Sequence, residues 1–134
     1  MPIIATGPVD LDGLMQVILR PFVDAFPPQN IRHHFVGQDD ERGIYAKEML
    51  IPAGWTLGSH EHGYDHLSIL ASGVARLTMG GKTETAVGPR AIVVPKGARH
   101  ELYAITPVTW YCIHPTDETD ADKVDQVILS QGGD

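Results

Sequence analysis

The sequence has little of several features that define common classes of protein. It contains one cysteine, Cys112, which cannot form an internal disulfide, so the chain does not resemble a secreted domain held together by disulfides. It has no run of about 18 apolar residues, which argues against a membrane-spanning helix. The first four residues, Met-Pro-Ile-Ile, lack the basic start and long apolar core of a signal peptide. A cytoplasmic location is therefore the expectation.

Positive charge is also scarce. Ten Lys and Arg residues stand against 17 Asp and Glu residues, so the formal net charge is −7 with neutral histidines. An acidic surface repels phosphate backbones and no Lys/Arg cluster is present, so no nucleic-acid partner is expected. The 134 residues, 43% of them hydrophobic and 20% charged, suit one globular domain with a single core.

The N-terminal part predicts a short helix. Apolar residues at positions 11, 14, 17 and 18 lie near helical spacing between Leu11 and Leu19, and Pro21 would end the helix. The acidic tail from Thr116 to Asp134 leaves two alternatives open. Its apolar positions, 124, 127 and 128, suit one face of a helix or an extra strand, and periodicity does not decide between them.

From about residue 31 the pattern changes to short apolar or alternating runs punctuated by glycine and proline. Strands are predicted over 43–51, 66–71, 74–79, 82–87, 91–94, 101–106 and 108–113. Gly80-Gly81 is a typical two-residue hairpin turn. The core face of 43–51 stays open between Ile44, Ala46 and Leu50 and the opposite set Tyr45, Met49 and Ile51. Many short strands at this spacing predict an all-β sandwich or barrel.

Four of the seven histidines lie in two compact clusters inside this β region. His60 and His62 are two residues apart, so on an extended strand both side chains point to one face. His66 can begin the next strand beside them, and His100 follows a turn at the start of a later strand. Imidazole suits Mn, Fe, Ni, Co, Cu and Zn. The clusters therefore predict one divalent transition metal, of undetermined identity, bound by His60, His62, His66 and His100.

The two clusters resemble the two sequence motifs of the cupin superfamily. The matching positions of the first are Gly54, His60, His62 and Gly73, and those of the second are Pro95, Gly97 and His100. Two positions depart from the second motif. Gly88 is one residue farther from Pro95 than the motif requires, and Ala104 stands where the motif commonly has asparagine. The resemblance implies an all-β double-stranded β-helix, a jelly-roll barrel. We expect one cupin domain over 1–134, with a barrel core at about 43–113, an N-terminal extension at 1–42 and a tail at 114–134.

His66 stands where the first motif usually has glutamate. The replacement removes one negative charge, so a divalent ion held by neutral imidazoles keeps its full positive charge and favours an anionic or enolate-like ligand. The resemblance implies small single-domain cupins with four histidine ligands, some of which bind manganese or another first-row metal and support oxidative chemistry. The alternative is a three-histidine site from which His66 points away.

A second resemblance concerns residues 64–68 and 110–117, Tyr-Asp-His-Leu-Ser and Trp-Tyr-Cys-Ile-His-Pro-Thr-Asp. They are similar to small cupins encoded among tailed-bacteriophage and prophage genes. This resemblance adds a biological context and implies no activity.

Other residues near the motifs are candidates for supporting roles. A substrate pocket is predicted from Tyr64, Arg76, Met79, Tyr103 and Trp110, with core packing, or a solvated strand face for Arg76, as the alternative. Tyr103 is the candidate general base. Asp65 is expected either to orient a histidine or to cap a turn.

The remaining polar residues receive no role in the predicted site. Alternation turns Glu61 outward. We expect His33, His34 and His114 to be surface or structural residues, and Cys112 to be a buried packing residue.

The favoured hypothesis is a metal-dependent oxygenase, a dioxygenase or other oxidoreductase, acting on a small anionic or enolizable substrate. The alternatives are a non-catalytic module that binds metal and a small ligand, or a metal-free structural accessory protein, in a phage for example. No membrane partner is expected. A homodimer is predicted because segments before residue 43 and after residue 114 are available for strand addition; light scattering at micromolar concentrations would exclude it by showing a monomer.

Overall fold

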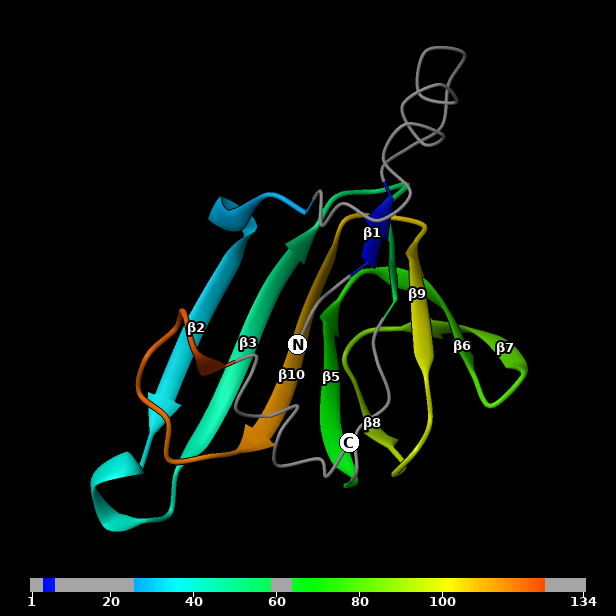
Figure 1. Ribbon diagram of the computed structural model, residues 1–134. Helices are drawn as coiled ribbons and strands as arrows, with labels where there is room; N and C mark the ends of the chain where they lie inside the picture. The colour runs from blue at the N-terminus through cyan, green and yellow to red at the C-terminus, as the bar shows by residue number, and fades with distance from the viewer. Residues whose placement is uncertain (1–3, 7–25, 59–63, 125–134) are drawn as a thin grey trace.

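The computed structural model describes residues 4–6, 26–58 and 64–124. In these residues the chain forms two five-stranded antiparallel sheets that face each other (Figure 1). Sheet A contains, in spatial order, β1 (Ile4–Thr6), β4 (Thr56–Gly58), β9 (His100–Ala104), β6 (Val74–Met79) and β7 (Lys82–Val87). Sheet B contains β2 (Ile31–Val36), β3 (Ile44–Ile51), β10 (Val108–Pro115), β5 (His66–Ser72) and β8 (Arg90–Val94). Two 3₁₀ helices, η1 (Pro28–Asn30) and η2 (Gln38–Asp40), flank β2.

The expected all-β barrel is confirmed, and every strand predicted after residue 43 is present. Two of them, 74–79 and 82–87, coincide with β6 and β7, which pair across the Gly80-Gly81 turn. The short strands β1 and β4 and the edge strand β2 were not predicted. The predicted helix over 11–19 and the tail positions 127 and 128 lie outside the described residues.

The open question about β3 is settled by its burial. Tyr45, Met49 and Ile51 are at most 3% exposed, so the second of the two alternative faces points between the sheets. Lys47 lies on the same face by alternation and is 3% exposed. The interior of the barrel therefore contains a polar residue that hydrophobicity alone would place outside.

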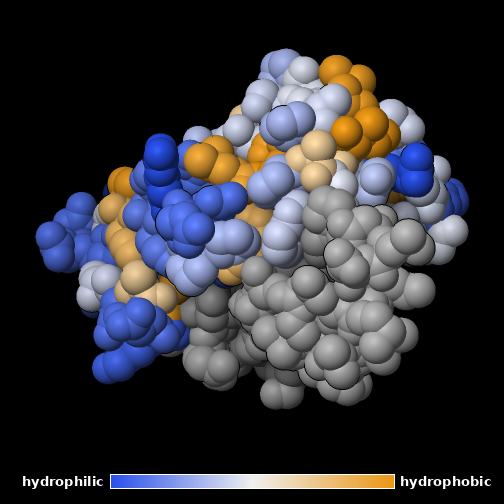
Figure 2. Space-filling view, turned by 90° about the horizontal axis from the view of Figure 1, so that it is seen from above, coloured by the Kyte–Doolittle hydropathy of each residue, from blue (hydrophilic) through white to orange (hydrophobic). Residues whose placement is uncertain are grey.

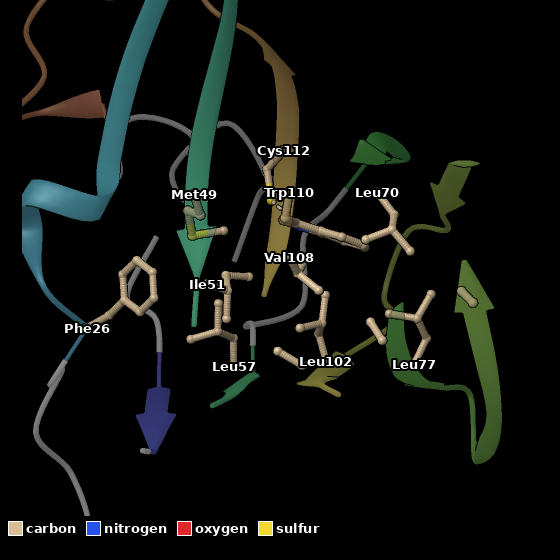
Figure 3. Close-up of a cluster of buried hydrophobic side chains, with 13 residues drawn as sticks. Phe26, Met49, Ile51, Leu57, Leu70, Leu77, Leu102, Val108, Trp110 and Cys112 are labelled. Carbon is tan, nitrogen blue, oxygen red and sulfur yellow. Dashed lines mark hydrogen bonds between the residues drawn. The ribbon is translucent and has the colours of Figure 1, made fainter. Parts of the chain in front are cut away.

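The hydrophobic core fills one part of the space between the sheets (Figure 3). Sheet B contributes Ile51, Leu70 and Trp110, and sheet A contributes Leu77 and Leu102. Further core residues include Phe26, Met49, Leu57, Val108 and Cys112. Burial of this apolar surface is the main force that holds the sheets together.

Gly73 makes the tight turn between β5 and β6. Its φ is +96°, in the region that side chains rarely adopt, and a Cβ there would collide with the carbonyl oxygen of Pro107. This motif glycine is therefore required by the backbone of the turn.

Polar and apolar side chains are mixed on the described part of the face in Figure 2, where hydrophobic residues form small groups. Large apolar residues such as Val36 and Val93 are more than 60% exposed on edge strands. In the described ranges, no helix combines the length and apolar character needed to cross a membrane.

Candidate functional site

His66 and His100 approach each other from opposite sheets. His66 is the first residue of β5 in sheet B, and His100 is the first residue of β9 in sheet A. Their ring centroids are 5.8 Å apart with an angle of 52° between the planes. Both nitrogens of His66 and the Nε2 atom of His100 are buried. The structure thus directs His66 into the barrel, toward the other described histidine of the predicted site.

The alternation of β5 explains this orientation. His66, Ser68 and Leu70 are buried, whereas Leu67 and Ile69 are partly exposed. Because Leu70 packs in the core, the same strand face carries His66 to the interior.

A loop contact joins the two motifs beside the histidines. The Oδ1 atom of Asp65 accepts a hydrogen bond of 2.7 Å from the backbone N–H of Lys96. Lys96 lies in the turn closed by the Ala98 N–H and the Pro95 carbonyl at 3.1 Å. Of the two predicted roles for Asp65, the structure shows turn capping, and the capped turn belongs to the second motif.

The separation of the two rings suits a shared metal ion. Two imidazoles that bind one metal at nitrogen distances of about 2.0–2.1 Å have ring centroids no more than roughly 6.5 Å apart. The 5.8 Å between His66 and His100 is within that limit.

His60 and His62 lie outside the described residues. Among the residues that are described, no three His, Cys, Asp or Glu side chains are grouped so that they could hold a metal ion.

His114 is buried, so of the two expected positions, surface or structural, the structure shows the structural one. It is 1% exposed and stacks on His66 with ring centroids 4.7 Å apart and an angle of 25° between the planes. Its Nδ1 atom is hydrogen-bonded to the Tyr64 hydroxyl at 2.9 Å. The predicted strand ended at residue 113, but β10 continues to Pro115, so Trp110, Cys112 and His114 share its inner face. Continuing that alternation by two residues would have found His114.

Tyr64 lies beside both histidines of this stack. Its ring is edge-on to His114, with centroids 5.9 Å apart, and to His66 at 6.5 Å. Burial raises the pKa of Tyr64 from 10.0 to about 12. The phenol is therefore neutral throughout the physiological range and stays available to hydrogen-bond His114.

This pKa shift predicts a loss of stability at high pH. The folded-state pKa of Tyr64 is about 12 and its unfolded value is 10.0, so its contribution to stability is complete below pH 10 and is lost as the pH rises toward 12. We expect the wild-type minus Tyr64→Phe difference in absorbance at 295 nm to show a phenol with a midpoint near pH 12. A midpoint near pH 10 in the folded protein would contradict the buried position.

A cavity of about 340 Å³ opens between the sheets next to His100. Two of the predicted pocket residues, Met79 and Trp110, line it, and Trp110 is edge-on to His100 with centroids 6.3 Å apart. Its other lining residues come mainly from β6, β7, β8 and β9. Tyr64 is not among the lining residues, because it lies on the side of His66 and His114.

Arg76 and Tyr103 lie elsewhere, on the outer face of sheet A. They are paired across β6 and β9, and the Arg76 guanidinium carbon lies 5.4 Å from the centre of the Tyr103 ring. Both are exposed, because the inward positions of these strands are taken by Ala75, Leu77, Leu102 and Ala104. The structure therefore places neither residue in this cavity. Tyr103 is not positioned there to act as a general base.

An ion pair spans the edges of the two sheets near the cavity. The Nη2 atom of Arg90 on β8 donates to the Oε1 atom of Glu84 on β7 at 2.7 Å. Glu84 also lines the cavity. Both side chains are exposed, so the pair lies at the solvent side of the space between the sheets.

A second polar cluster lies on β2 and β3, and its residues precede His66, His100 and His114 in the sequence. Glu48 is 7% exposed and accepts a hydrogen bond of 2.8 Å from the His34 Nε2 atom, with Arg32 at 3.7 Å. Burial and the Glu48 carboxylate raise the pKa of Tyr111. His33 is hydrogen-bonded to the Tyr45 hydroxyl at 2.6 Å, so His33 and His34 are exposed structural residues, as predicted.

Comparison with protein-family models and with curated proteins found no match. Solved structures do match. A protein from Photorhabdus luminescens has a TM-score of 0.55 at 10% identity, over 79% of this chain and 97% of that chain. A putative ethanolamine utilization protein Q from Salmonella typhimurium has 0.52 at 18%, over 66% and 69%. A cupin protein from Bacteroides fragilis has 0.51 at 16%, over 63% and 76%. With the two antiparallel sheets, these likenesses show that the chain has a cupin-type barrel fold.

Proposed function

We propose that this cupin binds one divalent transition metal through His60, His62, His66 and His100, and binds a small molecule in the adjacent cavity. The observation that carries the proposal is the pair of His66 and His100, whose ring centroids lie 5.8 Å apart across the sheets, with both nitrogens of His66 and the Nε2 atom of His100 buried. Neutral imidazoles are suitable ligands for first-row transition metals. The spacing of His60 and His62 in the first motif adds the other two ligands.

The surrounding residues suit the support of such a site. His114 stacks on His66, and Tyr64 fixes His114 through the bond to Nδ1, so the pair limits rotation of the His66 ring. Trp110 lies edge-on to His100 on the cavity side, which limits the space available to its ring. A bound metal would supply Lewis acidity and open positions for ligands, which is the chemistry that a metal-dependent oxygenase uses.

Metal content tests the proposal directly. Protein made without a histidine tag is analysed for elements as purified, and again after chelation and reconstitution with Mn, Fe, Co, Ni, Cu or Zn in turn. We expect about one transition metal per chain for at least one of them. Protein that takes up no metal after reconstitution would overturn the proposal.

An enzyme and a binding module differ in the coordination of the metal. A catalytic site keeps a position for water or substrate, whereas a structural site is closed by protein ligands. Water-proton relaxation of manganese-loaded protein measures this difference. Enhanced relaxation favours the oxygenase and justifies oxygen-uptake screening, and no enhancement favours a structural metal.

His114→Phe is expected to weaken metal binding by about 10- to 100-fold, as losses of residues that support metal ligands do. Phenylalanine keeps a ring against His66 but cannot hydrogen-bond Tyr64, so Tyr64 no longer fixes the stack. Competition with a chromophoric chelator measures the affinity. Tyr64→Phe removes the same hydrogen bond from the other side and should give a similar loss. Wild-type affinity in both variants would show that the stack does not position His66.

A further inference from the structure

We infer that the cavity beside His100 selects a small neutral molecule with an apolar body, such as a carbonyl or hydroxyl compound carrying a ring or short chain. The inference rests on the proposed function in one respect: it places the polar atom of the ligand at the histidine end. The sequence predicts an anionic or enolizable substrate. The inference keeps neutral, enolizable compounds and excludes anions.

The walls of the cavity are the first reason. Leu77 and Leu102 of sheet A and Ile92, Val94 and Trp110 of sheet B all line it. Leu102, Val94 and Trp110 are at most 4% exposed, so the walls continue into the core and are fixed by its packing. A ligand in this space would exchange water for apolar contact over most of its surface.

The charges around the cavity are the second reason. Among the described lining residues, Glu84 and Glu101 carry negative charge and the exposed Lys82 carries positive charge. The guanidinium of Arg90 is bound to the Glu84 carboxylate of the cavity lining at 2.7 Å. With Arg90 counted, two negative and two positive charges surround the cavity, so they offer an anion no net attraction. An anion would also leave water for apolar walls, which is costly without a paired cation.

Most polar lining residues of the cavity lie on β9 or β7, with Thr78 on β6 between these strands. His100 is at the end near His66, whereas Lys82, Thr83 and Glu84 lie on the edge strand β7. A ligand with an apolar body and one oxygen can place the oxygen beside His100 and the body against Trp110 and Leu102. The polar part of the ligand then contacts the polar part of the cavity, and its apolar part contacts the apolar walls.

A matched pair of probes tests the inference. 2-Naphthol is neutral at pH 7, and 2-naphthoate has the same ring system with a carboxylate. Both are titrated by calorimetry into chelator-treated and metal-reconstituted protein, in the wild type, Ile92→Trp and Val93→Trp. Ile92 lines the cavity, whereas Val93 is the next residue of β8 and is 62% exposed on the other face. Ile92→Trp therefore fills the cavity, and Val93→Trp is its control.

We expect 2-naphthol to bind chelator-treated protein one per chain, at least about tenfold more tightly than 2-naphthoate, and to remain the tighter ligand when the charge of a bound metal narrows the difference. Ile92→Trp should abolish binding and Val93→Trp should retain it. Tighter binding of 2-naphthoate in either form, no binding of 2-naphthol, or equal effects of the two tryptophans would overturn the inference. Metal content is measured on the same samples, so a failure of the proposed metal site is seen separately from a failure of the ligand class.

Discussion

Replacing His100 with alanine is expected to reduce bound metal from about one per chain to below roughly 0.2 after dialysis, because losing a direct ligand should exceed the 10- to 100-fold cost of losing a supporting residue. His66→Ala should do the same, since its ring faces His100 from the opposite sheet. A site that lost one ligand would also be open to water. Elemental analysis after dialysis against metal-free buffer measures the effect in both variants.

The control for these variants is His34→Ala. His34 is an exposed histidine of β2 whose ring bonds Glu48, so its removal changes the histidine count without touching the proposed site. It should retain the wild-type metal content. Near-ultraviolet circular dichroism on each variant shows whether the core is intact. Full metal content in folded His66→Ala and His100→Ala would contradict the proposed ligand set.

Trp110→Ala is expected to lower the free energy of unfolding by about 3–5 kcal/mol, the range for removing a large aromatic side chain from a core. Trp110 is 4% exposed and packs in the hydrophobic cluster of the barrel (Figure 3). Its Nε1 atom also donates to the Cys112 Sγ atom at 3.2 Å, and this contact would be lost. Urea denaturation of metal-free protein measures the change without a contribution from metal binding.

Val93→Ala provides the comparison for Trp110→Ala. Val93 is 62% exposed on an edge strand, so its loss should cost less than about 0.5 kcal/mol. If Trp110→Ala cost no more than Val93→Ala, the described packing around Trp110 would be wrong. A large loss for Trp110 alone would show that the wall of the cavity is also part of the core.

Much of the fold could be predicted from the sequence because local patterns determine it. The alternation in 74–79 and 82–87 and the Gly80-Gly81 turn determine the β6–β7 hairpin without reference to the rest of the chain. The strands β1 and β4 are three residues long, too short for a periodic pattern. The pattern of β2 is weak because it is an edge strand with mostly exposed side chains.

The candidate site was predicted less completely, for a different reason. Motif spacing identified His66 and His100, but which face of each strand points inward depends on the packing of the opposite sheet. Arg76 and Tyr103 illustrate this, since both lie one residue out of phase with the inward positions of their strands. The burial of His114 was missed because it depends on β10 continuing beside β3, where His114 pairs with Tyr45, far away in sequence.

The position of His66 and His100 on different sheets has a consequence for the lifetime of the folded state. An ion bound by both histidines would cross-link the two sheets, and it would have to be released before the sheets could separate. Such a cross-link would slow unfolding, because a ligand that binds only the native state stabilises that state. Resistance to proteolysis would then depend on how much metal is available, and the protein would persist longest where its metal is plentiful.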